Sequence, residues 1–239
     1  MTRTILWLTM AVTPSEDDAL MKDVLVWDVR TWTAAVDFWD RSLPQDGSQF
    51  TCLEIGAGPG GPSLWLALKG HEVICSNLKS TEIMAAPIHE KYGVSAKIRY
   101  QDIDATHVPY ENYFDVVIFK SVLGGVGSLQ VDAMAQILKS LKPGGILLFA
   151  ENIRGTVFHR LARSIAYRIR GTSWRYPTFA QMRALLDGFS TVEVHTTGVV
   201  AMFGNTESRR AALAGVDQRF LNRVTPRSWK YVSYGVATK

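Results

Sequence analysis

Short apolar runs alternate with longer amphipathic stretches along most of the chain. The apolar runs predict five strands, at residues 50–55, 71–76, 96–100, 112–119 and 146–150. The run at 112–119 has no polar alternation, which is typical of a strand buried on both faces of a parallel sheet. The amphipathic stretches predict helices at residues 62–69, 81–92 and 129–141. Strands and helices that alternate over short links predict a parallel sheet with right-handed crossovers.

The two ends of the chain follow different patterns. Apolar residues three or four positions apart within residues 24–39 predict one amphipathic helix, with Asp28 as its expected N-cap. Beyond the fifth strand, helices are predicted at 157–169 and 178–186, followed by strands at 191–197 and 230–238. The regular alternation therefore ends with the fifth strand.

A glycine-rich turn joins the first predicted strand to the helix after it. Gly56 and Gly58 allow a sharp bend and a close approach of the backbone to a ligand, and Gly60 or Gly61 lets the helix begin close to the strand. The N–H groups at the start of this helix would face that ligand. The glycine spacing also fits a dinucleotide fingerprint, or a turn that only packs a helix on a strand. Glu54 lies inside the strand, and a carboxylate beside an anionic pyrophosphate argues against a dinucleotide.

The segment Glu54 to Gly60, Glu-Ile-Gly-Ala-Gly-Pro-Gly, resembles the first motif of the class I S-adenosylmethionine-dependent methyltransferases. Three later features follow in the family's order, namely Asp104-Ala105 before Pro109, Phe114-Asp115 opening a strand, and the turn Lys142-Pro-Gly-Gly145. The resemblance spans Leu53 to Glu151. It implies an α/β fold, a doubly wound Rossmann-like sheet of about seven strands, mostly parallel with a C-terminal antiparallel hairpin, and helices on both faces.

The resemblance implies a single methyltransferase domain over residues 1–239. Its expected parts are an N-terminal helical arm at 1–49, a cofactor-binding core at 50–151, a helical lid or substrate insertion at 152–190, and C-terminal strands at 191–239. Shorter phrases, such as Phe149-Ala-Glu-Asn152 and Trp229-Lys-Tyr231, are similar to methyltransferases that modify bacterial sugars and surface polysaccharides.

The resemblance implies S-adenosyl-L-methionine as the cofactor and S-adenosyl-L-homocysteine as its product. It implies that Asp104 accepts a hydrogen bond from the adenine amino group and that the Ala105 N–H donates to the ring. Asp102 is the alternative by register, or else a cap of the turn. The family usually holds the ribose hydroxyls with an acidic residue at the end of the second strand, where this chain has Asn77. An amide binds the diol without charge assistance, so Asn77→Asp is expected to tighten cofactor binding.

The cofactor is thus expected to contact residues at the ends of four strands. These residues are Glu54, Gly56, Ala57, Gly58, Gly60, Asn77, Leu78, Ile103, Asp104, Ala105 and Lys120. Lys120 follows the fourth strand at its carboxyl end, where it contacts cofactor or substrate unless it extends to the surface.

Charge is distributed unevenly along the chain. Residues 1–150 carry 12 Lys and Arg against 17 Asp and Glu, whereas residues 151–239 carry 14 against 5. The resulting net charges of −5 and +9 add to the +4 of the whole chain. The basic half predicts an anionic substrate or surface, unless it is only a solvated face. The residues expected to bind the methyl acceptor are Asn152, Arg154, Arg163 and Trp174.

With the resemblance, these features predict O-methylation of a hydroxyl on a sugar, glycan or other small anionic acceptor. His159 is the candidate general base, with a structural role as the alternative. Other candidates are N- or C-methylation of another small metabolite, methylation of RNA or protein, and a non-catalytic S-adenosylmethionine-binding module. Nucleic acid is the less favoured partner, because the chain lacks the Asn/Asp-Pro-Pro-aromatic motif of base-amino methylases.

Cysteine content and hydropathy bear on location. Cys52 and Cys75 fall on predicted strands and are expected to be free, buried thiols, which favours a reducing cytoplasm. No run reaches the roughly 18 apolar residues that span a bilayer, so no transmembrane segment is predicted, and the apolar run at 5–12 is expected to be a loosely packed arm. The basic half leaves contact with the inner membrane surface as an option. No metal site is expected, and the oligomeric state stays open, with a homodimer as one option.

Overall fold

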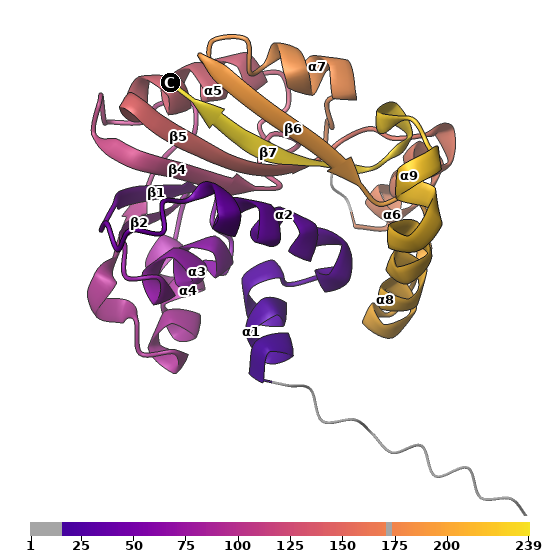
Figure 1. The fold of residues 1–239 in the computed structure, drawn as a ribbon, viewed down its shortest axis with the longest axis horizontal. Coiled ribbons are helices and arrows are strands. Elements are labelled where there is room, and N and C mark those ends of the chain that lie inside the picture. The colour runs from indigo at the N-terminus through magenta and orange to yellow at the C-terminus, as the bar shows by residue number, and fades with distance from the viewer. Residues whose placement is uncertain (1–15, 171–173) are drawn as a thin grey trace, which may run out of the picture.

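The computed structural model describes residues 16–170 and 174–239. The apolar run at 5–12, expected to be a loosely packed arm, lies outside the described residues. The described part of the chain forms a seven-stranded sheet with the strand order β3-β2-β1-β4-β5-β7-β6 (Figure 1). The strands are β1 (Thr51–Ile55), β2 (Glu72–Asn77), β3 (Ile98–Asp102), β4 (Phe114–Lys120), β5 (Leu141–Asn152), β6 (Thr191–Thr197) and β7 (Val232–Thr238).

The sheet is parallel except at its C-terminal edge. β1 pairs in parallel with β2 and β4, β2 with β3, and β4 with β5. β7 is antiparallel to both β5 and β6. The strand order reverses between β1 and β4, and open sheets of this type bind ligands at the carboxyl ends of the strands beside such a reversal. This arrangement confirms the predicted doubly wound sheet with its antiparallel hairpin.

Helices cover both faces of the sheet (Figure 1). One face is covered by α1 (Glu16–Leu25), α2 (Val29–Ser42), α3 (Gly61–Leu68) and α4 (Thr81–Lys91). The other face is covered by α5 (Gln130–Ser140) and α7 (Phe179–Ala184). Past the carboxyl end of β5 lie α6 (Val157–Arg170), α8 (Glu207–Val216) and α9 (Asn222–Val224). The short helical turns are η1 (Ser95–Lys97), η2 (Ala201–Phe203), η3 (Asp217–Leu221) and η4 (Arg227–Trp229).

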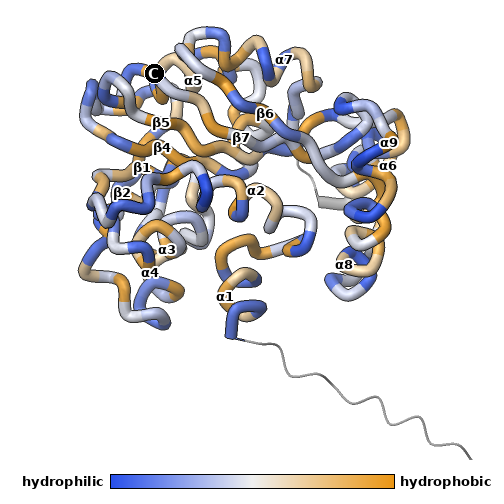
Figure 2. The backbone as a smooth tube through the Cα atoms, viewed as in Figure 1, coloured by the Kyte–Doolittle hydropathy of each residue, from blue (hydrophilic) through white to orange (hydrophobic). Residues whose placement is uncertain are grey.

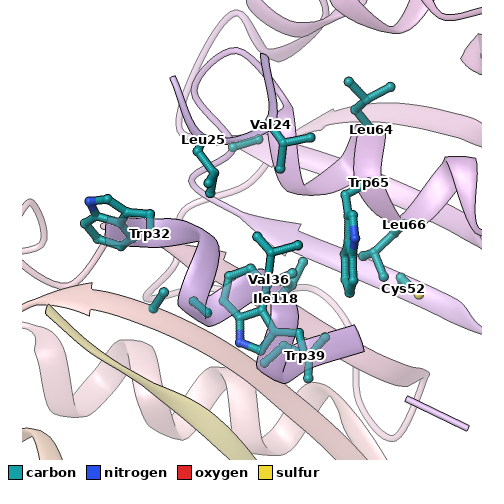
Figure 3. Packing of buried hydrophobic residues seen from close by; sticks show 14 of the residues in the cluster. Val24, Leu25, Trp32, Val36, Trp39, Cys52, Leu64, Trp65, Leu66 and Ile118 are labelled. Atoms are coloured by element: carbon teal, nitrogen blue, oxygen red, sulfur yellow. The ribbon is translucent and has the colours of Figure 1, made fainter. Parts of the chain in front are cut away.

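Two buried clusters fill the space between the sheet and its helices. On the α2–α3 side, Trp32 and Trp39 of α2 belong to one buried cluster with Trp65 of α3. The rings of Trp39 and Trp65 are 6.0 Å apart, and Trp32 lies at the other end of α2 (Figure 3). On the α5 side, Phe119 and Phe149 from neighbouring strands stack at 6.2 Å. Figure 2 shows apolar residues concentrated along β4 and β5, between the helical layers. Trp32 and Trp39 are both fully buried and therefore belong to the core.

The helix predicted within residues 24–39 is observed as α2, which begins directly after Asp28, whereas residues 24 and 25 belong to the separate helix α1. Val26 and Asp28 have φ of 70° and 49° between α1 and α2, and a left-handed residue interrupts a helix. Asp28 also does not cap α2 with its side chain, which accepts a hydrogen bond from the Tyr231 hydroxyl at 2.6 Å instead. The carboxylate of Glu207 accepts from the Asp28 and Val29 N–H groups at 3.0 and 2.7 Å.

β5 begins earlier than predicted. Leu141 already pairs with Phe114, and the pairing then shifts to Ile146 opposite Val116, so that residues 142–145 form a bulge. Both cysteines are buried and free, as expected. Among the described helices, none has the length and apolar content to cross a membrane.

Candidate functional site

Three glycines with positive φ carry the chain from β1 into α3. Gly56, Gly58 and Gly60 have φ of 64°, 54° and 86°, values that residues with a side chain rarely adopt. A Cβ on Gly56 would lie 2.6 Å from Val122, whereas a Cβ on Gly58 would meet no described atom within 4 Å. The turn is therefore packed against the loop after β4 and open beside Gly58.

The rest of the turn is tied to β2 and α4. The Ala57 N–H donates to the Ser76 carbonyl at 2.8 Å. The Gly60 carbonyl lies 2.9 Å from Nε2 of His89, and a Cβ on Gly60 would collide with that ring. Gly56 and Gly58 therefore lie at the exposed edge of the turn, whereas Ala57 is buried and Gly60 faces α4.

Glu54 is buried beneath the turn and holds the start of α3. Its carboxylate accepts hydrogen bonds from the Ser63 N–H, at 2.8 Å, and from the Ser63 hydroxyl. Burial raises the pKa of this carboxyl to about 8, against the lowering effects of Ser63 and of the Lys120 charge. The Glu54 carboxylate therefore binds the first turn of α3 within the protein.

The side chain of Asn77 forms two hydrogen bonds with the glycine turn. Its Oδ1 accepts from the Gly58 N–H at 2.7 Å, and its Nδ2 donates to the Gly58 carbonyl at 3.1 Å. A ribose diol could engage only the second N–H and the second lone pair of this amide. The side chain therefore shapes the turn, a role that the sequence analysis did not assign to it.

The two aspartates near the end of β3 have separate roles. Asp102 accepts hydrogen bonds from the N–H groups of Ser80 and Thr81, which begin α4, at 3.1 and 2.9 Å. Asp104 is exposed and accepts from the Thr106 N–H at 2.8 Å, a hydrogen bond that lowers its pKa. Because Asp102 is a cap, Asp104 remains the candidate for the adenine. The neighbouring Ile103 and Ala105 are buried, and Leu78 is exposed.

Lys120 extends from the carboxyl end of β4 toward α2. Its Nζ lies 4.6 Å from the centre of the Trp32 ring. Burial lowers the pKa of this lysine to about 8, and the charges of Glu151, Glu54 and Asp28 oppose the shift. The alternative that Lys120 extends to the surface is therefore wrong, since the side chain points into the molecule.

Unpaired polar atoms lie close to Lys120. Oδ1 of Asp28 and Nε1 of Trp32 are buried and have no hydrogen-bond partner among the described residues. Burial raises the pKa of Asp28 to about 6. An acceptor, a donor and an ammonium group thus lie near one another beside α2. The sequence analysis did not identify Trp32 as a site residue.

Glu151 holds the loop after β4, although the list of expected site residues omits it. Its carboxylate accepts hydrogen bonds from the N–H groups of Val122 and Leu123, at 2.7 and 2.6 Å, and from that of Asn152 at 2.8 Å. Burial raises its pKa to about 7. The loop that packs on Gly56 is thereby fixed to β5.

Asn152 and Arg163 are connected to each other. The Asn152 amide donates to the Ser121 hydroxyl at 2.9 Å and accepts from Arg163 at 3.3 Å. Arg163 also donates to the Ile153 carbonyl at 2.7 Å and lies 4.3 Å from the centre of the Tyr176 ring. Asn152 and Arg163 therefore join α6 to the strand ends, which leaves them less free for an acceptor than expected.

Residues 174–177 lie over the loop that follows β4. A Cβ on Gly124 would lie 2.7 Å from Tyr176 and 2.9 Å from Trp174, so the glycine makes room for both rings. The Arg175 N–H donates to the Gly124 carbonyl at 2.9 Å. Beside this contact lies a cavity of about 920 Å³, the lid cavity, which is lined by Arg154, Arg160, Arg163, Tyr167, Arg168, Trp174 and Tyr176 among others.

His159 does not fit the role of general base. Its Nδ1 accepts from the Thr156 N–H at 2.9 Å, and its Nε2 donates to the Val199 carbonyl at 2.6 Å. The ring stacks on Phe203 at 5.2 Å, and burial lowers its pKa. Because both nitrogens are engaged within the protein, His159 is a neutral link between α6 and the loop after β6.

The amino-acid sequence is similar to that of known proteins. The family model described as a methyltransferase domain matches residues 53–149. The tRNA 5-carboxymethoxyuridine methyltransferase of Escherichia coli K12 is 31% identical over 130 residues, which cover 51% of this chain and 48% of that protein. The chain spans about half the length of the curated relatives that this match represents.

Solved structures share the fold at low sequence identity. The Haemonchus contortus phosphoethanolamine N-methyltransferase 2, in complex with phosphomonomethylethanolamine and S-adenosylhomocysteine, aligns with a TM-score of 0.61 and 18% identity, covering 87% of this chain and 52% of that one. The [4+2]-cyclase SpnF aligns with a TM-score of 0.59 and 17% identity, covering 95% and 97%. One fold thus carries proteins with differently named activities.

Proposed function

We propose that the protein transfers a methyl group from S-adenosylmethionine to a hydroxyl of a small anionic acceptor, as a class I S-adenosylmethionine-dependent methyltransferase. The match of residues 53–149 to a methyltransferase domain and the shared fold support this proposal. The products are S-adenosylhomocysteine and the methyl ether. The acceptor class that we favour is a sugar or glycan that bears a phosphate or a carboxylate.

The donor fits the edge formed by the glycine turn and α2. The backbone is open beside Gly58, where a ligand can approach closely. The amino-acid tail of the donor carries a carboxylate and an ammonium group. Lys120 suits the carboxylate, and the unpaired Oδ1 of Asp28 suits the ammonium group. The exposed Asp104 stays our candidate partner for the adenine.

The lid cavity is the observation that carries the acceptor class. Arginines from α6 and from residue 154 line it together with tyrosine and tryptophan rings. Guanidinium groups bind phosphate and carboxylate through paired N–H donors, and aromatic rings stack on sugar faces. Arg154 is exposed at this cavity, whereas Arg163 is engaged with the backbone. We therefore assign anion binding first to Arg154.

The chemistry asks little of the protein beyond alignment. The sulfonium group already activates the methyl group that it carries. The protein holds the acceptor oxygen in line with that methyl carbon, which is a proximity effect. A donor held by Lys120 and Asp28 would supply the methyl group to the acceptor oxygen and would leave as S-adenosylhomocysteine, while the hydroxyl proton would pass to solvent. His159 has no part in this step, because its ring nitrogens are already paired.

The proposal is tested by binding followed by transfer. Calorimetry with S-adenosylhomocysteine establishes the donor site. Labelled S-adenosylmethionine is then offered with sugar phosphates, uronic acids and the matching neutral sugars. We expect transfer to anionic sugars alone. Donor binding without transfer to any acceptor would instead support a non-catalytic module, and transfer to neutral sugars alone would reject the anionic class.

Methylation of RNA is a second candidate that one observation favours. The relative from Escherichia coli, 31% identical over its matched part, is named for a tRNA nucleoside. Residues 151–239, with 14 Lys and Arg against 5 Asp and Glu, suit a polyanion. Bulk tRNA is therefore included among the acceptors, and label recovered in tRNA but not in sugars would favour this candidate.

We propose the cytoplasm as the place of reaction, on the basis of the free cysteines, with attachment to the inner membrane surface.

A further inference from the structure

α6 carries apolar residues on the side that faces away from the protein. Val157, Phe158, Leu161 and Ile165 are between 55% and 69% exposed, and their spacing places them along one side of the helix. We refer to these four residues as the α6 apolar face. The polar residues His159 and Arg163 of the same helix point inward. An ordinary surface helix has the reverse arrangement, so this face requires a separate explanation.

The apolar surface continues beyond the helix. Phe203 and Trp229 are exposed, and they line the same cavity of about 850 Å³ as Val157 and Phe158. They come from η2 and η4, which follow β6 and precede β7. Three separate segments thus contribute large apolar side chains to one region, and contiguous apolar surface of this kind marks an interaction site.

The surroundings of this surface are strongly basic. Between Glu151 and Asp187 the sequence contains seven arginines and no acidic residue. Arg160 and Arg168 are exposed on α6 itself. Arg227 is exposed two residues before Trp229. The partner must therefore accept apolar side chains and carry negative charge.

We propose that the α6 apolar face binds to the surface of a bilayer that contains anionic lipids. Phe158, Leu161 and Trp229 enter the boundary between head groups and acyl chains, while the arginines contact lipid phosphates. A basic helix with a continuous apolar side has this behaviour at membranes. A second copy of the chain is the poorer partner, because a symmetric contact would bring the same arginines together.

The location of α6 gives this surface a consequence for the acceptor. Arg160, Arg163 and Tyr167 of the same helix line the lid cavity, and in Figure 1 α6 lies near α8 and α9 at the carboxyl end of the sheet. Resting on the proposed function, we infer that the acceptor is held at the membrane by a lipid anchor. Its anionic head group reaches the lid cavity while the anchor stays in the bilayer.

The test uses the full chain and vesicles, without methyl donor. Vesicles of phosphatidylcholine alone are compared with vesicles that also contain phosphatidylglycerol, and the bound fraction is measured by sedimentation. We expect binding only to the anionic vesicles. The double variant Phe158→Asp, Leu161→Asp should bind at least about tenfold more weakly. Ile83→Asp is the matched control, because this exposed residue of α4 is outside the surface, and it should bind as the wild type does.

Fold and donor site are checked separately, by thermal unfolding and by S-adenosylhomocysteine calorimetry on each variant. A double variant that is folded and binds vesicles like the wild type would overturn the proposal. So would a wild type that ignores anionic vesicles, or a stable dimer that the double variant dissociates. If the wild-type protein does not bind S-adenosylhomocysteine, the proposed function is refuted, and the vesicle result can still be interpreted. If vesicles are bound but lipid-linked anionic sugars are not methylated, the inference about the acceptor fails while the docking surface stands.

Discussion

The ammonium nitrogen of Lys120 lies 4.6 Å from the centre of the Trp32 ring, between the carboxyl end of β4 and helix α2. A cation above an aromatic face is stabilised without a hydrogen-bond partner. Burial nevertheless lowers the pKa of this lysine to about 8. A buried ammonium group poised beside unpaired polar atoms is suited to an anionic ligand, and the donor carboxylate is the ligand that we assign to it.

Lys120→Met should weaken binding of S-adenosylhomocysteine by about 10- to 100-fold. A hydrogen bond to a charged group contributes roughly 1.5–3 kcal/mol, which corresponds to that range. In the wild type, affinity should stay constant below about pH 8 and fall above it, because the ammonium group loses its proton. Calorimetry across pH 6.5–9.5 measures both effects. A variant with wild-type affinity, or with the same pH dependence, would remove Lys120 from the donor site.

Asn77→Asp should weaken donor binding, which reverses the expectation drawn from the sequence. The Asn77 Nδ2 group donates to the Gly58 carbonyl at 3.1 Å, and a carboxylate would place an acceptor against that carbonyl. Loss of a buried hydrogen bond costs about 1–3 kcal/mol. Titration with S-adenosylhomocysteine, together with a melting curve, measures the change. Tighter binding by the aspartate variant would show that the amide turns away from Gly58 to reach the ribose.

Arg154→Ala should raise the KM for an anionic acceptor about tenfold or more while kcat changes little. Arg154 is exposed at the lid cavity, so its loss removes binding without disturbing packing. The matched control is Arg183→Ala, an exposed arginine of α7, which should leave both constants unchanged. The measurement is steady-state kinetics with a sugar acid that the wild type methylates. Equal KM values in the wild type and both variants would contradict the assignment of anion binding to Arg154.

His159→Ala should lower stability and leave the chemical step intact. The ring bonds to the Val199 carbonyl and stacks on Phe203, and its loss should cost about 2–4 kcal/mol. For a chain of this size the melting temperature should fall by roughly 5–15 °C. Turnover per donor-bound molecule, measured well below the melting temperature, should stay within about threefold. A loss of several hundredfold with an unchanged melting temperature would restore His159 as the base.

Asp28→Asn should stabilise the protein at neutral pH. The pKa of Asp28 is raised from 3.8 to about 6, so between these values the unfolded chain releases a proton that the folded protein keeps. Wild-type stability therefore falls as pH rises from about 4 to 6, by up to about 3 kcal/mol. Asparagine still accepts from the Tyr231 hydroxyl and does not ionise. Urea unfolding at pH 4, 5, 6 and 7 should show an advantage that grows with pH, and a constant difference would disprove it.

The sequence by itself determined the order of elements and the position of the glycine turn. Apolar periodicity is a local property, and it placed β1 to β4, β6 and β7 within a few residues of their observed bounds. Gly56 and Gly58 could be identified because only glycine readily adopts the positive φ that this bend requires. The left-handed break at Val26 escaped this reasoning, because a β-branched residue rarely adopts a positive φ.

The polar groups that are free for chemistry could be identified from the folded structure but not from the sequence. Asp28 accepts a hydrogen bond from Tyr231, which is 203 residues away in the sequence, and His159 donates one to Val199, which is 40 residues away. Such partners are set by how strands and helices meet, and no local pattern encodes them. For the same reason the sequence could not show that Asp102 caps α4, that Arg163 bonds to the Ile153 carbonyl, or that Lys120 lies over the Trp32 ring. Most buried polar groups are paired, and the fold selects the partner of each.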